Sequence, residues 1–443
     1  MEDSYRVSVF GMGYVGSVTA ACFAKLGHAV IGVDTDAAKV GMIGAGQPPL
    51  IEPELSELIA EGSRSGRLCA TTDAGEAVAA TQISFVCVGT PSLRGGKLDL
   101  AHVEHVCTEI GRSLARKRAP HLVVLRSTML PGSTRAVAQP ALERGSGGRA
   151  GVDFSLAYHP EFMREATAVR DFFDPPYTVL GADDSSHLEP LRRLYSTHNA
   201  PVLTMGLAEA EMVKYMSNVF HAVKIGFANE MGTLAKHLGV DTEVVTAAFL
   251  SDTKLNVSRC YLEPGFAFGG SCLPKDLRAV QHRAKELNLK LPMLEAVLAS
   301  NEEHLRRAAE LILSTGKKRI AMLGLSFKTG TDDLRESPQV QLVKRLLGEG
   351  CSMRIWDDQV LLSRVMGANR AYIEREIPHI GLLLADDLEE TLAGAELVVI
   401  ATTAASTRNL ARFLRPDHLV VDLVHLEAQR RQGGQAAYQG ICW

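Results

Sequence analysis

Short apolar runs alternate with amphipathic stretches along the N-terminal part of the chain. Residues 7–10 and 29–34 have the apolar content of buried strands, and residues 14–26 have the spacing of a helix that ends at Gly27. Further strand-like runs follow in the segments ISFVCVGTP, LVVLRSTMLPGST and FSLAYHPEFMRE. Strands that alternate with helices form parallel sheets with helices on both faces, so the pattern predicts a doubly wound α/β domain.

The turn between the first strand and the first helix carries the glycine pattern GMGYVG. Gly11 and Gly13 would allow a tight turn and a close approach to a pyrophosphate at the helix N-terminus, and Gly16 would let the helix pack on the strand. Asp34, at the end of the next strand, would bind an adenosine ribose and repel the extra phosphate of NADP. The alternative is an ordinary βαβ turn. We favour an NAD-binding Rossmann-like domain over residues 1–203.

Polar side chains follow each of the three later strands. Thr90 follows the first, Thr128 the second, and Glu161, Arg164 and Glu165 the third. Ligands bind at the carboxyl ends of the strands in open α/β sheets. One threonine at a strand end is more often a local cap, but three polar strand ends in register predict a cleft.

A helical pattern without proline covers residues 207–238 and predicts a long central helix, which we expect to be shared at a dimer interface. Lys214, Asn218 and His221 share one face of this helix, and Asn229 returns near that face. Burying these polar groups on a largely apolar helix would be costly without partners. The alternative is that the polar stripe faces solvent.

The segment FAFGGSCLPKD places Cys272 after two glycines and just before Lys275 and Asp276. A nearby cation or a helix N-terminus lowers the pKa of a thiol and activates it, and Pro274 suits the first turn of a helix that begins after the cysteine. Lys275 and Asp276 would anchor cofactor or substrate and assist proton transfer. Beside a nicotinamide, such a cysteine favours covalent aldehyde oxidation, in which the sulfur adds, hydride leaves to NAD and a thioester is hydrolysed.

A second α/β pattern begins at Lys317 and continues to the end of the chain. Its segments are KKRIAMLGLSF, QVQLVKRLLGEG, CSMRIWDD, ELVVIATT and HLVVDLV, and GLSFKTG is not a dinucleotide fingerprint. This half is either a structural repeat or a nucleotide-sugar half that closes over the cleft with Lys328 and Arg335, and we favour the second reading. We predict a central helical domain with the cysteine loop over residues 204–305 and a Rossmann-like nucleotide-sugar-binding domain over residues 306–443.

The charge balance gives no basic field for nucleic acid or an anionic membrane, because 47 basic residues face 51 acidic ones. No apolar run approaches the roughly 18 residues of a membrane span. The start MEDSYRVSVF is acidic and enters a strand directly, so we expect no signal peptide and a cytoplasmic protein. The eight cysteines lack zinc-site spacing, so we expect no metal and no structural disulfide. Cys22, Cys87 and Cys107 lie in apolar patterns and are expected in the core.

Segments in the same order along nearly the whole chain carry a resemblance to a known family. They are FGMGYVG, FVCVGTPS, STMLPG, HPEFMRE, AEMVKYMSNVFHAVKIGFANE, PGFAFGGSCLPKD and GLSFKTGTDDLRESP. The chain resembles the NAD-dependent nucleotide-sugar 6-dehydrogenases, which include the UDP-glucose and GDP-mannose enzymes. His221, the continuous PGFAFGGSCLPKD and the terminal GICW are most similar to the GDP-mannose branch.

The resemblance implies a four-electron oxidation of the sugar C6 alcohol to a carboxylate, with two NAD and one covalent cysteine intermediate. GDP-mannose is the expected substrate, and UDP-glucose or a related UDP-sugar is the alternative. A GDP-mannuronate product would feed a uronic-acid exopolysaccharide such as alginate. The implied architecture is two Rossmann-like doubly wound domains joined by a long central helix and a helical dimerisation region.

The resemblance also implies roles for individual residues. Cys272 would be the nucleophile, Lys214 and Asn218 would stabilise oxyanions, and Asp276 and Glu165 would handle protons and water. The implied cofactor-binding set is Gly11, Gly13, Tyr14, Val15, Gly16, Asp34, Lys39, Thr90, Thr128, Lys275 and Arg335. The implied substrate-binding set is Glu165, Lys214, Asn218, His221, Asn229, Tyr261 and Lys328.

Three positions depart from the pattern expected in this branch. Cys260 stands where an aromatic residue is expected, Glu263 where a basic residue is expected, and His159 where asparagine is usual. A carboxylate near a diphosphate would weaken binding unless another cation compensates, and Arg259 and Lys254 are the candidates. The departures leave the chemistry intact and bear on which base and sugar are recognised.

Two other classes of protein share part of this pattern. A two-electron dehydrogenase of small hydroxy acids also joins a Rossmann domain to a long helix, but it needs neither Cys272 nor a second α/β half. A non-catalytic NAD-sensing or scaffold protein would have no reason to keep Lys214, Asn218, Cys272 and Asp276 together. We therefore favour the enzyme with the cysteine nucleophile.

Overall fold

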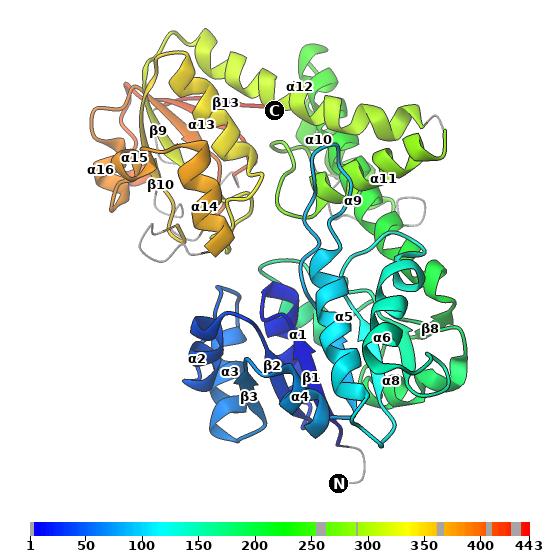
Figure 1. Ribbon diagram of the computed structural model, residues 1–443. Helices are drawn as coiled ribbons and strands as arrows, with labels where there is room; N and C mark the ends of the chain where they lie inside the picture. Colours follow the sequence, from blue (N-terminus) through cyan, green and yellow to red (C-terminus); the bar gives the residue numbers. More distant parts are fainter. Residues whose placement is uncertain (1–3, 254–262, 289–290, 361–366, 405–409, 427–435) are drawn as a thin grey trace. The chain divides into compact units, whose positions relative to one another are not determined.

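The computed structural model describes residues 4–253, 263–288, 291–360, 367–404, 410–426 and 436–443. Two compact units make up the chain, Met1–Ser217 and Asn218–Trp443 (Figure 1). Each unit contains one open sheet whose strands are nearly all parallel, as the alternating pattern predicts.

The first unit is built on an eight-stranded sheet in the order β3-β2-β1-β4-β5-β6-β7-β8. The strands are β1 (Arg6–Phe10), β2 (Ala29–Val33), β3 (Leu68–Thr71), β4 (Ile83–Val86), β5 (Leu122–Leu125), β6 (Ser155–Tyr158), β7 (Thr178–Gly181) and β8 (Val202–Met205). Neighbouring strands are parallel except β6 and β7, which are antiparallel. β4, β5 and β6 are neighbours, so the polar residues that follow them lie at one edge of the sheet.

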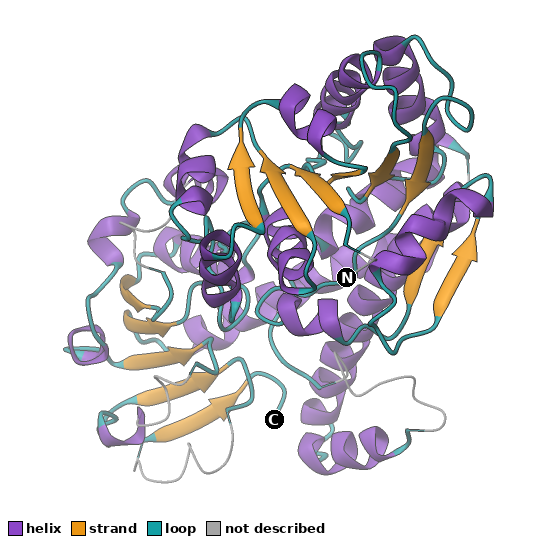
Figure 2. Ribbon diagram, turned by 90° about the horizontal axis from the view of Figure 1, so that it is seen from below, coloured by secondary structure: helices purple, strands orange, loops and turns teal. Residues whose placement is uncertain are grey.

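Helices cover both faces of this sheet, and two apolar cores lie between the layers (Figure 2). One face is covered by α1 (Tyr14–Lys25), α2 (Ala37–Gly44), α3 (Leu55–Arg64), α7 (Ala168–Phe173) and α8 (Glu189–Leu194). The other is covered by α4 (Ala74–Ala80), α5 (Ala101–Leu114) and α6 (Gln139–Ser146). Two short turns complete the unit, η1 (Thr134–Ala138) and η2 (Ser185–Leu188). Strands such as ISFV are buried along their whole length, which explains their unbroken apolar runs.

The long central helix is present as α9 (Leu207–His237), which confirms the prediction from residues 207–238. α10 (Thr242–Ser251) follows, and Asp241 caps it by accepting hydrogen bonds from the amides of Glu243 and Val244. α11 (Leu273–Glu286) and α12 (Pro292–Ser314) come next in the second unit. In α11, Pro274 lies in the first turn, as predicted.

The sheet of the second unit has five parallel strands in the order β10-β9-β11-β12-β13. They are β9 (Arg319–Leu323), β10 (Ser352–Trp356), β11 (Leu397–Ile400), β12 (Leu419–Asp422) and β13 (Ala437–Gly440). The accompanying helices are α13 (Pro338–Gly348), α14 (Gly367–Glu376), α15 (Ile380–Leu383) and α16 (Leu388–Leu392). The predicted second Rossmann-like sheet is therefore confirmed, and β13 is an additional strand. Among the helices of the described ranges, none has the length and apolar content to cross a membrane.

Candidate active site

The glycine turn before α1 has the geometry that a pyrophosphate requires. Gly11 has a φ of +91°, and its amide donates to the Val33 carbonyl at 2.7 Å. A Cβ on Gly16 would lie 1.8 Å from the Gly11 carbonyl oxygen, so only glycine allows this contact of helix and turn. A Cβ on Gly13 would meet nothing within 4 Å, so the space beside the helix N-terminus is open. These residues fit the pyrophosphate of NAD.

Asp34 is held in a fixed orientation beside this turn. One carboxylate oxygen accepts from the Met12 amide at 2.7 Å, and the other accepts from the Asp36 amide at 2.9 Å. The Lys39 ammonium lies 3.2 Å from the first oxygen. The two residues predicted for the adenosine end of the cofactor therefore lie together.

The ends of β4, β5 and β6 carry the other predicted groups of the first unit. The Thr90 hydroxyl donates to the carbonyl of Thr128 at 2.8 Å, which ties the ends of β4 and β5 together. After β6, the buried Glu161 accepts from the Lys214 ammonium of α9 at 2.7 Å. Glu161 also accepts from the Met163 amide at 2.9 Å. The buried lysine thus has the charged partner that its burial requires.

Glu161 is a residue whose role sequence reasoning missed. It follows a strand, but the sequence pattern around it indicates no function. The signal available in the sequence was Lys214 itself, because a lysine on a buried helix face needs a carboxylate partner. Nothing local indicates which of the acidic residues of the chain supplies it.

The predicted cysteine lies at the start of α11 in the second unit. Cys272 is exposed and occupies the N-cap position. Asp276 is buried in the first turn of the same helix and accepts a hydrogen bond from the Asn218 side chain of α9. The Lys275 ammonium lies 3.1 Å from the other oxygen of Asp276. The structure therefore gathers Asn218, Lys275 and Asp276 beside the thiol-bearing turn.

The two glycines before Cys272 are explained by close packing. A Cβ on Gly269 would lie 2.4 Å from the Glu336 carbonyl oxygen and from Pro338. Gly270 has a φ of +85°, and a Cβ there would lie 2.8 Å from the ring of Phe327. Only glycine lets the cysteine loop pack this closely against the segment between β9 and α13.

Three side chains hold the loop that leads to these glycines. Asn229 of α9 accepts from the Gly265 amide at 2.9 Å and donates to the Phe266 carbonyl at 3.2 Å. Asn301 of α12 accepts from the Phe268 amide at 2.8 Å and donates to its carbonyl at 2.9 Å. The His304 ring lies 2.7 Å from the Gly265 carbonyl oxygen. Sequence reasoning missed Asn301 and His304, which have no local pattern around them.

The polar stripe of α9 does not face solvent. Lys214, Asn218 and Asn229 are all buried, and His221 is half-buried. The solvent-facing alternative is therefore wrong for these residues. The cost of burying the stripe is offset by hydrogen bonds to Glu161, to Asp276 and to the cysteine loop.

The remaining predicted groups of the second unit lie near β9 or outside the described residues. Arg335 makes a two-pronged contact with Asp333, with its Nε at 2.9 Å from one oxygen and its Nη2 at 2.5 Å from the other. Lys328 lies in the same segment after β9 and is half-buried. Tyr261 and Cys260 lie outside the described residues.

Glu263 lines a cavity of about 270 Å³ at the start of α10. Other lining residues are Glu243, His425 and Trp443. His425 Nε2 lies 2.9 Å from the Glu243 carboxylate. The titratable groups of the lining are therefore two glutamates and one imidazole.

His159 points into the core of the first unit. Its Nδ1 lies 2.7 Å from the Val179 carbonyl oxygen, and its ring packs edge-on against Tyr195 at 4.8 Å. Burial, with the nearby Arg126 charge, holds the pKa of His159 well below its usual range.

The three cysteines expected in the core, Cys22, Cys87 and Cys107, are all buried, which confirms that expectation.

Three consecutive regions match the models of one protein family. Residues 5–199 match the NAD binding domain of the UDP-glucose/GDP-mannose dehydrogenase family, residues 208–303 its central domain and residues 321–426 its UDP binding domain. The chain belongs to this family. The third region is the second α/β half, which a two-electron hydroxy-acid dehydrogenase does not need.

Several known proteins are similar to this chain over almost its whole length. A GDP-mannose 6-dehydrogenase of Azotobacter vinelandii is 46% identical over 438 residues, which are 99% of this chain and 100% of that protein. The structure of a UDP-glucose dehydrogenase from Pyrobaculum islandicum is 38% identical, with a TM-score of 0.89 over 99% of this chain and 98% of that one. The ternary complex of GDP-mannose dehydrogenase from Pseudomonas aeruginosa is 45% identical, with a TM-score of 0.57 over 99% and 100%. The protein is an NAD-dependent nucleotide-sugar dehydrogenase.

Proposed function

We propose that the protein oxidises GDP-mannose to GDP-mannuronate with two NAD. The observation that carries the choice of substrate is the match to GDP-mannose 6-dehydrogenase over 99% of this chain and all of that protein. The half-buried His221 on α9 and the terminal GICW, which resemble the GDP-mannose branch, support the same choice. The product would be a precursor of a uronic-acid polysaccharide of the alginate type.

The chemistry proceeds through Cys272. NAD, when bound, accepts one hydride in each of the two oxidations. The C6 alcohol becomes an aldehyde, the Cys272 thiolate adds to it, and the resulting thiohemiacetal is oxidised to a thioester that water hydrolyses. One alcohol, one water and two NAD⁺ give one carboxylate, two NADH and three protons, so atoms and electrons balance.

The residues of the second unit support the nucleophile in this proposal. Cys272 is the N-cap residue of α11, so it lies at the positive end of the helix dipole, which would favour a thiolate there. Asn218 donates to Asp276 and thereby fixes the carboxylate for proton transfer, while its amide is suited to binding an oxyanion. Lys275 partly balances the buried charge of Asp276.

Residues of the first unit have the remaining roles in this proposal. Lys214 would stabilise the oxyanions, and its ammonium lies 2.7 Å from the buried Glu161 carboxylate, a partner that offsets the cost of burying it. Glu165 would direct the water that attacks the thioester. Asp34 and Lys39 would bind the adenosine end of NAD, and the glycine turn its pyrophosphate.

A UDP-glucose 6-dehydrogenase, or a related UDP-sugar enzyme, is the second candidate. It is supported by the similarity to the Pyrobaculum enzyme and by the acidic Glu263, where the GDP-mannose branch is expected to have a cation. The chemistry at Cys272 would be the same with either substrate.

We further propose that the protein acts in the cytoplasm as a homodimer or higher homo-oligomer, because NAD and nucleotide sugars are cytoplasmic metabolites and α9 exposes an apolar stripe. The limits 1–203, 204–305 and 306–443 remain our proposal for its three domains.

The test is the number of NADH formed per GDP-mannose, with the sugar nucleotide limiting and NAD in excess. We expect two NADH per sugar, because a thioester mechanism completes both oxidations before release. The variant Cys272→Ala should lose about 1000-fold or more in turnover, since it removes the nucleophile. Cys69→Ala is the matched control, because Cys69 is also an exposed free cysteine.

The other outcomes of this measurement are equally decisive. One NADH per sugar would contradict the thioester mechanism. No NADH with GDP-mannose but two with UDP-glucose would assign the second candidate. Tight NAD binding without turnover of any sugar nucleotide would indicate a non-catalytic protein.

A further inference from the structure

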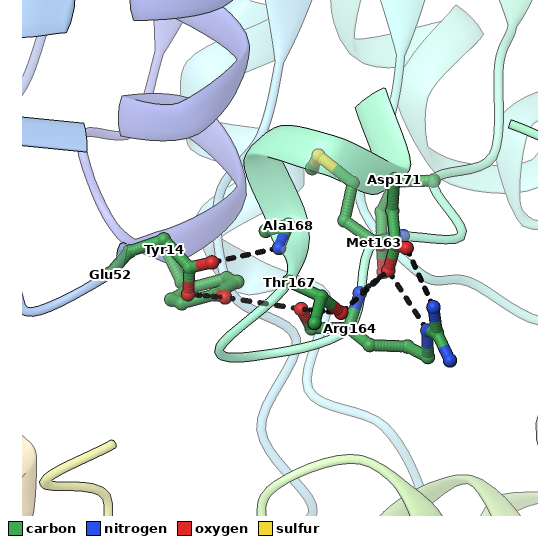
Figure 3. Close-up of polar contacts among 8 residues, drawn as sticks. Tyr14, Glu52, Met163, Arg164, Thr167, Ala168 and Asp171 are labelled. Atoms are coloured by element: carbon green, nitrogen blue, oxygen red, sulfur yellow. Dashed lines mark hydrogen bonds and ion pairs between the residues drawn. The ribbon is translucent and has the colours of Figure 1, made fainter. Parts of the chain in front are cut away.

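Glu52 is a buried carboxylate that none of the roles above uses. It lies just before α3 in the first unit, and only 6% of it is exposed. Three donors converge on its two oxygens, and two of them, Tyr14 and Ala168, are labelled in Figure 3. The Tyr14 hydroxyl and the Ala166 amide donate to one oxygen, the latter at 2.8 Å, and the Ala168 amide donates to the other at 2.7 Å.

The two amides belong to the segment that carries Glu165. Ala166 has a φ of +69°, a left-handed conformation that is strained for a residue with a Cβ and persists only where the surroundings hold it. On the other side of Glu165, the Arg164 amide donates to Asp171 at 2.9 Å, and its guanidinium binds the same carboxylate at 2.9 and 2.7 Å (Figure 3). Both neighbours of Glu165 are therefore anchored.

The third donor ties this segment to the cofactor turn. Tyr14 is the first residue of α1, directly after Gly13. Burial and the hydrogen bond to Glu52 raise the pKa of the Tyr14 hydroxyl, and the Glu165 charge adds to the effect. The hydroxyl therefore stays protonated and donates. The Glu165 carboxylate is close enough to interact electrostatically with it. The Tyr14 oxygen also lies 3.5 Å from the Arg164 carbonyl oxygen.

We infer that Glu52 is a positioning residue that holds the Glu165 segment in register with the glycine turn of the NAD site. It acts through backbone amides and Tyr14. A displacement of about 1 Å at a reacting group lowers rates about 100-fold, so contacts that fix the position of Glu165 have a large effect on turnover. This inference rests on the proposed function only for the role of Glu165 in hydrolysis.

The first test measures how firmly Glu52 holds the Glu165 segment and needs no turnover. In Glu52→Gln, a side-chain amide has one oxygen and one NH₂ group, so at least one donor faces another donor. Hydrogen–deuterium exchange of the amides in residues 161–168 should become about tenfold faster. Tyr14→Phe removes one donor and keeps both amide bonds, so exchange there should rise about threefold. Glu57→Gln, an exposed glutamate on α3, is the matched control and should exchange as the wild type does.

The second test separates positioning from general damage. In Glu52→Gln, kcat should fall at least tenfold while KM for NAD and for the sugar nucleotide changes less than about threefold. The first turnover should still form two NADH rapidly and be followed by a slow steady state, because attack of water becomes limiting. If Glu52→Gln fails to fold, Tyr14→Phe alone decides, with a smaller fall of kcat alongside its faster exchange.

Two results would overturn the inference. One is unchanged exchange of residues 161–168 in folded Glu52→Gln, or in Tyr14→Phe where Glu52→Gln does not fold. The other is a fall of kcat without a slow phase after the first turnover. A wild type that forms no NADH from any sugar nucleotide would instead contradict the proposed function and leave the exchange result standing.

Discussion

His159 shows how a single residue that departs from its family pattern is accommodated. Asparagine is usual here, and a change at this position was expected to bear on substrate recognition. The imidazole instead contacts the Val179 carbonyl and the Tyr195 ring inside the first unit. Its effect is therefore on stability, through a histidine kept neutral by burial.

The pKa of His159 makes stability depend on pH. Because its native pKa is lowered well below 6.5, the unfolded chain binds a proton below about pH 6.5 that the native state does not. The protein therefore has its full stability above the pKa of the unfolded histidine. Its free energy of unfolding falls progressively as the pH drops below that value. Between pH 7.5 and 5.5 the loss is about 1 kcal/mol. Urea denaturation followed by circular dichroism measures the free energy of unfolding. The value for the wild type, relative to that for His159→Asn, should fall by this amount between the two pH values.

The matched control for this measurement is His102→Asn, because His102 is exposed on α5. Its stability difference from the wild type should stay constant between the two pH values. A constant difference for His159→Asn as well would show that His159 is not held neutral in the native state.

At the level of elements, the glycines of the turn before α1 have two separable functions. Gly16 allows contact between the helix and the turn, since its Cβ would lie 1.8 Å from the Gly11 carbonyl oxygen. Gly13 has open space around it and a φ of −81°, which any residue adopts. Its lack of a side chain therefore serves the ligand and not the fold.

Two alanine substitutions in this turn should consequently behave differently. Gly13→Ala should change the free energy of unfolding by no more than about 1 kcal/mol, the cost of alanine at an N-cap, yet weaken NAD binding at least tenfold. Gly16→Ala should lower stability by about 3 kcal/mol or more, because a backbone atom must move. Thermal denaturation and titration with NAD measure both quantities. Equal losses of stability in the two variants would contradict this separation.

Local patterns predicted the elements well, and long-range pairs were the part that sequence reasoning could not supply. The β1–α1 turn, α9 and the proline-started α11 each follow from neighbouring residues. β3, β7, β8 and β13 were not predicted, and β13 shows why: AYQG is an edge strand with almost no apolar run. Glu161, Asn301 and Glu52 were missed as functional residues because each contacts a partner far away in sequence, and no periodicity marks such a pair.

At the scale of the whole molecule, the two faces of α9 invert the usual pattern of a surface helix. The polar stripe is buried, whereas large apolar side chains of α9 are exposed. Among the described residues of the helix these are Met212, Met216, Phe220, Phe227 and Met231, each between 44% and 67% exposed. At 100° per residue these five fall within an arc of about 100°, opposite the polar stripe. The rings of Phe227 and Phe249 of α10 lie 6.0 Å apart, so the apolar face extends onto the next helix. A large exposed apolar face of this kind indicates a protein partner.

We expect a second copy of the chain to cover this stripe. Light scattering after size exclusion should then give a dimer or larger species for the wild type. The double variant Met216→Glu, Phe227→Glu should weaken association at least about 100-fold and give monomers at micromolar concentration, because two charges would be buried in an apolar interface. Val152→Glu, which changes an apolar residue 77% exposed on a loop, is the matched control and should leave the species unchanged. A wild type that is monomeric, or a double variant that still associates, would show that the stripe is not the interface.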